Sequence, residues 1–205
     1  GPVGPSAGKP TTPLHLLVVL STAVGLGIGA LDPLGSFFVG YSVPIGVDEQ
    51  VAGVLLAVGG FCGIVARLVA GRLIDQKAEA DFTAIASMMV AGAAGIVMLN
   101  LGGYAGLIVG GFIGFTAGWG WSGLFTFAVV KDNPGAPAAA WGVAQTGKFL
   151  GAAIGPLLFG IVADRVSFSV AFWMTTAALL AAAVLILYVR NHRPAPSTTT
   201  DPHAR

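Results

Sequence analysis

In the C-terminal part of the chain, one apolar run reads Trp141-Gly142-Val143-Ala144-Gln145-Thr146-Gly147-Lys148-Phe149-Leu150-Gly151-Ala152-Ala153-Ile154-Gly155-Pro156. With its flanks, residues 138–164, it is long enough to cross a bilayer as a helix. Lys148 stands about 15 Å from Ala138, near the middle of a hydrocarbon core about 30 Å thick. A cation at that depth costs about 3 kcal/mol on insertion scales, so we expect Lys148 to face protein or water.

Two faces of this run have different characters. A polar row recurs at steps of three and four residues and consists of Trp141, Gln145, Lys148 and Ala152. A row of small residues lies beside it and consists of Gly147, Gly151 and Gly155. Small residues at four-residue spacing let another helix backbone come close, so we expect one face to pack and the other to look into a cavity. The alternative is that Lys148 is a structural cation paired with a carboxylate inside the bundle.

The composition indicates a polytopic α-helical membrane protein. Hydrophobic residues make up 55% of the 205 residues and charged residues only 9%, and the apolar runs are continuous, unlike the alternating segments of a barrel. The net charge of +1 and the lack of a basic patch give no indication of nucleic acid. Cys62 is the only cysteine, and the three histidines lack metal-ligand spacing, so neither a metal nor a cofactor is expected.

Six apolar segments are predicted, covering about 14–41, 51–73, 82–101, 104–130, 138–164 and 167–189. Residues 1–13 read as a solvated polar linker, 14–190 as one six-helix unit and 191–205 as a disordered cytoplasmic tail. Asp32-Pro33 is expected to kink or break the first segment in its outer part. The chain starts at Gly1 and not at Met, which favours a processed, excised or incomplete polypeptide.

The distribution of cations sets the expected orientation. With the N-terminus in the cytoplasm, all cations but two lie inside or at the inner interface: Lys9, Arg67, Arg72, Lys77, Lys131, Arg190, Arg193 and Arg205. Of the remaining two, Arg165 lies outside and Lys148 in the membrane. The prediction is a multi-pass protein of the cell (inner or plasma) membrane with both termini in the cytoplasm.

An internal repeat divides the six segments into two groups of three. The pattern G-x-x-x-D closes the second segment at 71–75 and the fifth at 160–164, an offset of 89 residues. The same shift brings the start of the first segment onto the start of the fourth. Because three is odd, the two copies have opposite orientations, and inverted three-helix repeats are a transporter architecture with a midplane site.

These residues resemble a known family. The run Ala66-Arg67-Leu68-Val69-Ala70-Gly71-Arg72-Leu73-Ile74-Asp75 resembles the loop motif of the major facilitator superfamily, in the copy between the eighth and ninth of twelve helices. Residues 145–160 are similar to the eleventh helix, particularly in the cyanate-permease-like branch. The resemblance covers about 14–190 and implies the C-terminal six-helix half of a twelve-helix fold. The partner would then be a missing N-terminal half or a second copy of the chain.

The resemblance also places residues. It implies that the first, second, fourth and fifth segments line a central cavity, and it puts there Lys148, Gln145, Trp119, Trp121 and Asp32. It further implies that Gly71, Arg72 and Asp75 latch the two halves on the cytoplasmic side, with Arg67 at the same face and badly placed for a midplane site. The alternative for the arginines is plain positive-inside anchoring.

The predicted function is secondary transport of a small anion by alternating access. Lys148 would supply the charge, Gln145 a hydrogen bond and Trp119 or Trp121 an apolar wall. Asp32 would be a counter-charge for Lys148 in the empty site or a protonatable group that couples transport to protons. The alternative is that Asp32 is a solvated residue near the outer end of a kinked helix and has no role in transport.

Two other functions fit parts of the sequence. Gly120-Trp121-Ser122-Gly123 has the G-x-S-G form found around the serine of rhomboid proteases, which also have about six helices. That chemistry needs a base, and no histidine lies within a predicted span, so we expect no enzyme activity. A non-transporting scaffold or channel piece would need only six packed helices, and the repeat and Lys148 argue against it.

Overall fold

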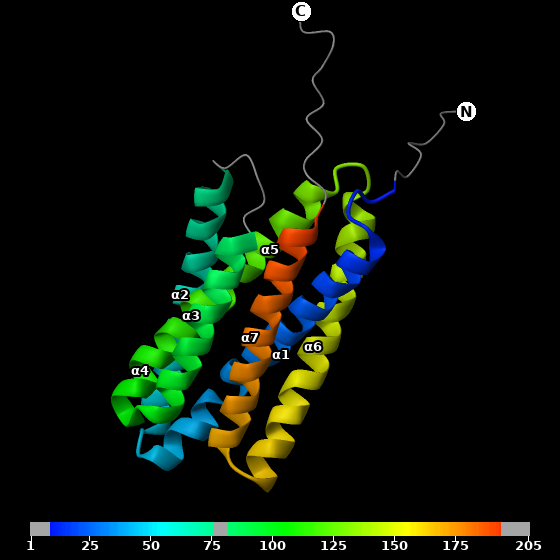
Figure 1. Ribbon diagram of the computed structural model, residues 1–205. Helices are drawn as coiled ribbons and strands as arrows, with labels where there is room; N and C mark the ends of the chain where they lie inside the picture. Colours follow the sequence, from blue (N-terminus) through cyan, green and yellow to red (C-terminus); the bar gives the residue numbers. More distant parts are fainter. Residues whose placement is uncertain (1–8, 76–81, 194–205) are drawn as a thin grey trace, which may run out of the picture.

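The computed structural model describes residues 9–75 and 82–193, without the side chains of 73–75, and is all α-helical over those residues (Figure 1). The elements in chain order are α1 (Leu14–Ser42), a 3₁₀ turn η1 (Val43–Ile45), α2 (Glu49–Asp75), α3 (Phe82–Leu101), α4 (Gly103–Ile113), a π-helical turn η2 (Gly114–Gly118), α5 (Trp119–Asp132), α6 (Pro137–Arg165) and α7 (Phe168–His192).

The described part contains six helical spans that are long and apolar enough to cross a membrane, with α4, η2 and α5 forming the fourth. This confirms the predicted fold class. The second group of three spans begins 89, 88 and 86 residues after the first, as the repeat requires. The first helix begins and the last one ends at the same end of the bundle (Figure 1), which fits an even number of crossings.

Pro33 does not break α1. The helix continues through it as far as Ser42, and Pro33 itself is buried. A proline in a membrane helix is tolerated when neighbouring groups satisfy the freed backbone carbonyl or hide it from lipid. The expected break in the outer part of α1 is therefore wrong, because α1 is a continuous helix with an internal proline.

The spans differ in how much of each is covered. Within one apolar 18-residue stretch of each span, buried residues make up 44% to 50% in α1, α3, α7 and the fourth span, but only 17% in α2 and 11% in α6. The core lies among the first group, with large side chains such as Phe38, Trp121 and Phe172 fully enclosed. The two exposed helices are the middle helices of the two repeats.

The glycine row of α6 packs on α1, backbone against backbone. A Cβ added at Gly151 would overlap the carbonyl oxygen of Gly25, and one at Gly155 that of Gly29. From the other side, a Cβ at Gly25 would lie 2.7 Å from the carbonyl oxygen of Gly147. The predicted close-packing face is therefore real, and its partner is α1.

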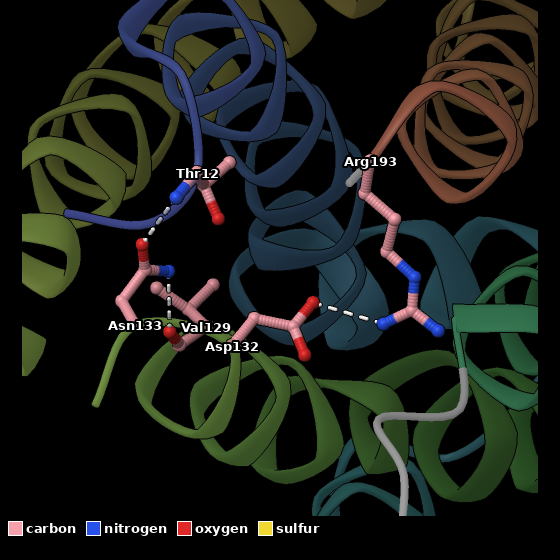
Figure 2. Close-up of polar contacts among 5 residues, drawn as sticks. All are labelled: Thr12, Val129, Asp132, Asn133 and Arg193. Atoms are coloured by element: carbon pink, nitrogen blue, oxygen red, sulfur yellow. Dashed lines mark hydrogen bonds and ion pairs between the residues drawn. The ribbon is translucent and has the colours of Figure 1, made fainter. Parts of the chain in front are cut away.

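Polar contacts tie together the end of the bundle where α1 begins (Figure 2). The Thr12 N–H donates to Asn133 Oδ1 at 2.9 Å, and Asn133 Nδ2 donates to the Val129 carbonyl at 2.9 Å. Arg193 pairs with Asp132 at 2.9 Å. Thr12 is buried, so the C-terminal end of the expected solvated linker packs on the loop after α5. Likewise, α7 extends to His192, two residues into the predicted tail.

Candidate functional site

Three charged side chains stand inside the spans: Asp32 on α1, Arg67 on α2 and Lys148 on α6. At about 1.5 Å per residue, they lie about 27, 12 and 16 Å from the end of the bundle where α1 begins. All three are half-buried. They come from three different helices and lie at different depths, with Asp32 farthest from that end.

Asp32 lies within electrostatic reach of both cations. The charges of Lys148 and Arg67 both act on its carboxylate. Within residues 9–75 and 82–193, however, the structure records no ion pair between Asp32 and either cation. The expected close pair of Asp32 and Lys148 is therefore not formed in this conformation, because Asp32 lies about 11 Å farther along the bundle than Lys148.

Lys148 points away from the α1–α7 side of α6. A groove of about 510 Å³ between α1, α6 and α7 is lined on α6 by Gly147, Leu150 and Ile154 but not by Lys148 or Gln145. Leu150 lies about 200° around the helix from Lys148, so the lysine is on the opposite side. The polar row predicted from sequence is thus separated from the packed glycine row.

Gln145 offers an unused acceptor one turn from Lys148. Its Oε1 is buried and has no hydrogen-bond partner in the part of the chain that the structure describes. A buried acceptor without a partner costs about 1 to 3 kcal/mol, so such a group is expected to meet a ligand, water or another chain. Gln145 is therefore a good candidate for the binding site.

Arg67 contacts Trp119 from the neighbouring helix. Its Nε donates to the Trp119 carbonyl at 3.0 Å, and its guanidinium carbon lies 5.0 Å from the centroid of the indole ring. Both residues line a cavity of about 410 Å³, together with Gly35, Gly63 and Phe115. Arg67 thus lines this cavity from a position about 12 Å inside the end of the bundle where α1 begins, and its expected poor placement for a midplane site stays a prediction. The helix continues two turns beyond Arg67, and the side chain turns inward to the tryptophan.

A π-helical turn sets the position of Trp119. Gly114–Gly118 form a single π turn directly before it, and π turns often occur at functional sites. At the start of α5, the Trp119 carbonyl accepts from both Arg67 Nε and the Ser122 hydroxyl. Nothing in the sequence apart from the density of glycine indicates this turn.

The two tryptophans have different environments. Trp121 is fully buried, packs on Phe125 with ring centroids 6.0 Å apart, and faces Gly27, where an added Cβ would lie 2.7 Å from its ring. Trp119 is half-buried and lines the cavity. Two residues are about 200° apart on a helix, so only one can face the cavity. Trp119 is therefore the candidate for the apolar wall, and Trp121 is a core residue.

The expected cytoplasmic latch is only partly described. Gly71 and Arg72 lie in the last turns of α2, and an added Cβ at Gly71 would meet no atom within 4 Å. Asp75 is the last residue of α2, and its side chain lies outside the described residues, as does the loop 76–81. The latch therefore stays a prediction.

The serine of the G-x-S-G pattern is engaged inside its own helix. The Ser122 hydroxyl donates to the Trp119 carbonyl at 2.9 Å. Of the histidines, His15 and His192 are described, and they lie in the first turn of α1 and the last turn of α7. Of the described histidines, both lie at helix ends, so neither is placed to act as the base for Ser122 in the middle of the fourth span.

Comparison with known proteins gives one family and one fold. Residues 17–204 match the sequence model of the Major Facilitator Superfamily. The structure is similar to that of FucP, a transporter of this superfamily solved in the outward conformation, with a TM-score of 0.71, 16% identity and 86% of this chain covered. It is also similar to the peptide transporter POT in complex with alafosfalin, with a TM-score of 0.73, 18% identity and 88% of this chain covered. The chain spans 42% and 38% of the lengths of these two proteins. No curated protein sequence matches it significantly.

Proposed function

The chain belongs to the Major Facilitator Superfamily, and from this premise we propose that it supplies the anion-binding half of a secondary transporter that works by alternating access. The observation that carries the proposal is the group of three charges in the bundle. The charges of Lys148 and Arg67 both act on Asp32, and among the described residues no ion pair joins either cation to it.

The charge balance favours an anionic substrate. With Asp32 ionised, the empty site carries one net positive charge, and an unpaired charge inside a membrane is costly. A small monoanion neutralises that charge. Gln145 Oε1 and Trp119 Nε1 are buried without partners and add one acceptor and one donor for a polar substrate. An anion with a hydroxyl, amide or protonated group would use both.

Asp32 gives the site a second way to balance its charge. If the carboxylate takes up a proton, the two cations together favour a dianion or a second anionic group. Substrate and proton would then enter as linked partners, which is how a proton gradient is coupled to transport. The cyanate-permease-like branch of the family stays a prediction, and cyanate belongs among the substrates to test.

The two exposed helices indicate where a second half would dock. The middle helices of the repeats, α2 and α6, are the least covered spans and expose large apolar side chains such as Phe61, Leu68 and Phe149. We infer that a complementary six-helix half, or a second copy of the chain, covers part of these faces and encloses the site. The cytoplasmic end of α2, which carries Arg72 and Asp75, would then contact the partner and act as the latch.

Orientation in the membrane follows the same proposal. The end of the bundle that carries Asp132, Arg193 and the start of α1 faces the cytoplasm, in line with the positive-inside distribution. Both ends of the chain are then cytoplasmic, and the site opens alternately to the two sides of the cell membrane.

Uptake of labelled anions tests the proposal. Proteoliposomes hold the native assembly, that is, the chain with whatever supplies its second half, and cyanate and small carboxylates are offered. Lys148→Gln and Lys148→Ala are expected to lose saturable uptake while they insert normally. Lys131→Gln, which removes a cation at the cytoplasmic end of α5, is the matched control and keeps uptake. Unchanged uptake in both Lys148 variants would overturn the anion site and leave only the superfamily assignment.

A further inference from the structure

Ser21 makes the only hydrogen bonds recorded between α1 and α6 among residues 9–75 and 82–193. Its hydroxyl donates to the Val143 carbonyl at 2.8 Å, and the Gly147 N–H donates back to it at 3.0 Å. In a regular α-helix, those two backbone groups bond to each other, because they are four residues apart. One side chain of α1 thus bridges a turn of α6, and the residue after that turn is Lys148.

The glycine part of the α1–α6 contact does not select its own register. Gly25 and Gly29 on α1 pack against Gly147, Gly151 and Gly155 on α6, and farther along the same two helices Phe37 packs on Phe159 with ring centroids 4.9 Å apart. Both glycine rows have a spacing of four residues, so a slip of one turn can bring Gly25 onto Gly147 and Gly29 onto Gly151. That slip moves α6 by about 6 Å along α1. Packing of small residues brings the helices together, and the contacts that distinguish one register from the next are the two hydrogen bonds of Ser21 at one end and the Phe37–Phe159 pair at the other.

We propose that Ser21 is a positioning residue that fixes the register of α6 on α1 and so the placement of Lys148 in the anion site. The proposal rests on the proposed function, since it gives Ser21 a role through Lys148. Asp32 lies on the same helix as Ser21, three turns farther on. The register therefore sets the distance between the carboxylate and the cation that together define the site.

Loss of the hydroxyl leaves two registers in competition. If only a fraction of the molecules holds Lys148 in the productive register, the apparent binding affinity is the intrinsic affinity multiplied by that fraction. At saturating substrate, binding shifts the remaining molecules into the productive register. Hydrogen bonds between membrane helices contribute modestly, so the expected rise in KM is about threefold to tenfold. The maximal uptake rate is expected to stay unchanged.

The test measures register and affinity separately. Spin labels are placed on the exposed positions Val18 of α1 and Leu157 of α6, with Cys62→Ala removing the native thiol. Their separation runs mainly along the helix axes, so a slip changes it directly. The native assembly with Ser21 is expected to give one distance, and Ser21→Ala a second distance population together with the raised KM. Thr22→Val is the matched control, because the Thr22 hydroxyl donates only to Val18 of its own helix.

Each outcome decides something. An unchanged distance distribution in Ser21→Ala would overturn the register role, whatever the KM. A second distance population with an unchanged KM would overturn the link to Lys148. Equal effects of Ser21→Ala and Thr22→Val on KM would also overturn it. The anion site itself is judged by Lys148→Gln uptake, and the label distances do not depend on that result, so failure of the proposed function and failure of the register role can be told apart.

Discussion

A single methyl group tests whether α6 is held to α1 by backbone contact. In Gly151→Ala, the new Cβ overlaps the Gly25 carbonyl oxygen and lies 2.7 Å from the carbonyl carbon and 2.9 Å from Cα of Gly25. Every one of these atoms belongs to backbone, so no side chain can turn away. Carbon atoms in good contact are about 3.5 to 4.0 Å apart, and the two helices must therefore separate locally by about 1 Å.

The magnitude follows from two opposing effects. Overpacking of this kind costs about 1 to 3 kcal/mol. Against this, replacing glycine by alanine inside a helix contributes up to about 1 kcal/mol in favour of folding. The net expectation for Gly151→Ala is a loss of up to about 2 kcal/mol. Gly142→Ala on the same helix has nothing within 4 Å of its new Cβ, so it keeps the favourable effect alone.

Reversible unfolding in mixed detergent micelles, followed by circular dichroism, measures the difference. The two variants change the same residue type in the same helix, so helix propensity cancels between them. We expect Gly142→Ala to be more stable than Gly151→Ala by about 1 to 3 kcal/mol, the overpacking cost alone. Equal stability of the two variants, or a more stable Gly151→Ala, would show that the helices are not in backbone contact.

Two further predictions concern the site and the core. Arg67→Gln is expected to raise the KM of anion uptake about a hundredfold. The reason is that a charge about 6 Å from a substrate contributes about 3 kcal/mol at an effective dielectric constant of about 20. An unchanged KM in proteoliposome uptake would show that Arg67 is not part of the site. Trp121→Ala is expected to lose about 3 to 5 kcal/mol as a fully enclosed aromatic, whereas Trp119→Ala folds and changes uptake. Size-exclusion profiles of the two tryptophan variants measure the folded fraction, and the reverse ranking would contradict the assignment.

The spans and the repeat could be predicted because they depend on properties of the sequence itself and not on contacts between distant residues. Continuous apolar runs have the length that a bilayer requires, and an offset of 89 residues is visible without knowledge of any contact. The glycine row of α6 was also readable, since its periodicity is that of a helix face. What it packs against was not, because the partner row on α1 carries only Gly25 and Gly29 between larger residues.

The site could be predicted only in part, because its missing members depend on how helices turn against one another. Arg67 was assigned to the cytoplasmic face from its distance along α2, and the reach of its side chain to Trp119 cannot be read from spacing. The π turn before Trp119 arises from packing of the glycine-rich fourth span. Trp119 and Trp121 are the same residue type in the same apolar segment. Only their angular positions on the helix place Trp119 at the cavity and Trp121 in the core.

The helix contacts also explain how an anion can act on more than one part of the bundle. Lys148 is carried by α6, which is joined to α1 by the glycine row and the Ser21 bridge. Arg67 is carried by α2, which is joined to α5 through the Trp119 carbonyl. The two cations therefore belong to different pairs of helices and repel each other when the site is empty, with Asp32 offsetting part of that repulsion. Under the proposed function, an anion that contacts both cations would replace their repulsion with attraction across the two pairs of helices. Its binding free energy would then depend on how the two pairs are arranged, which is the condition for a ligand to shift a conformational equilibrium.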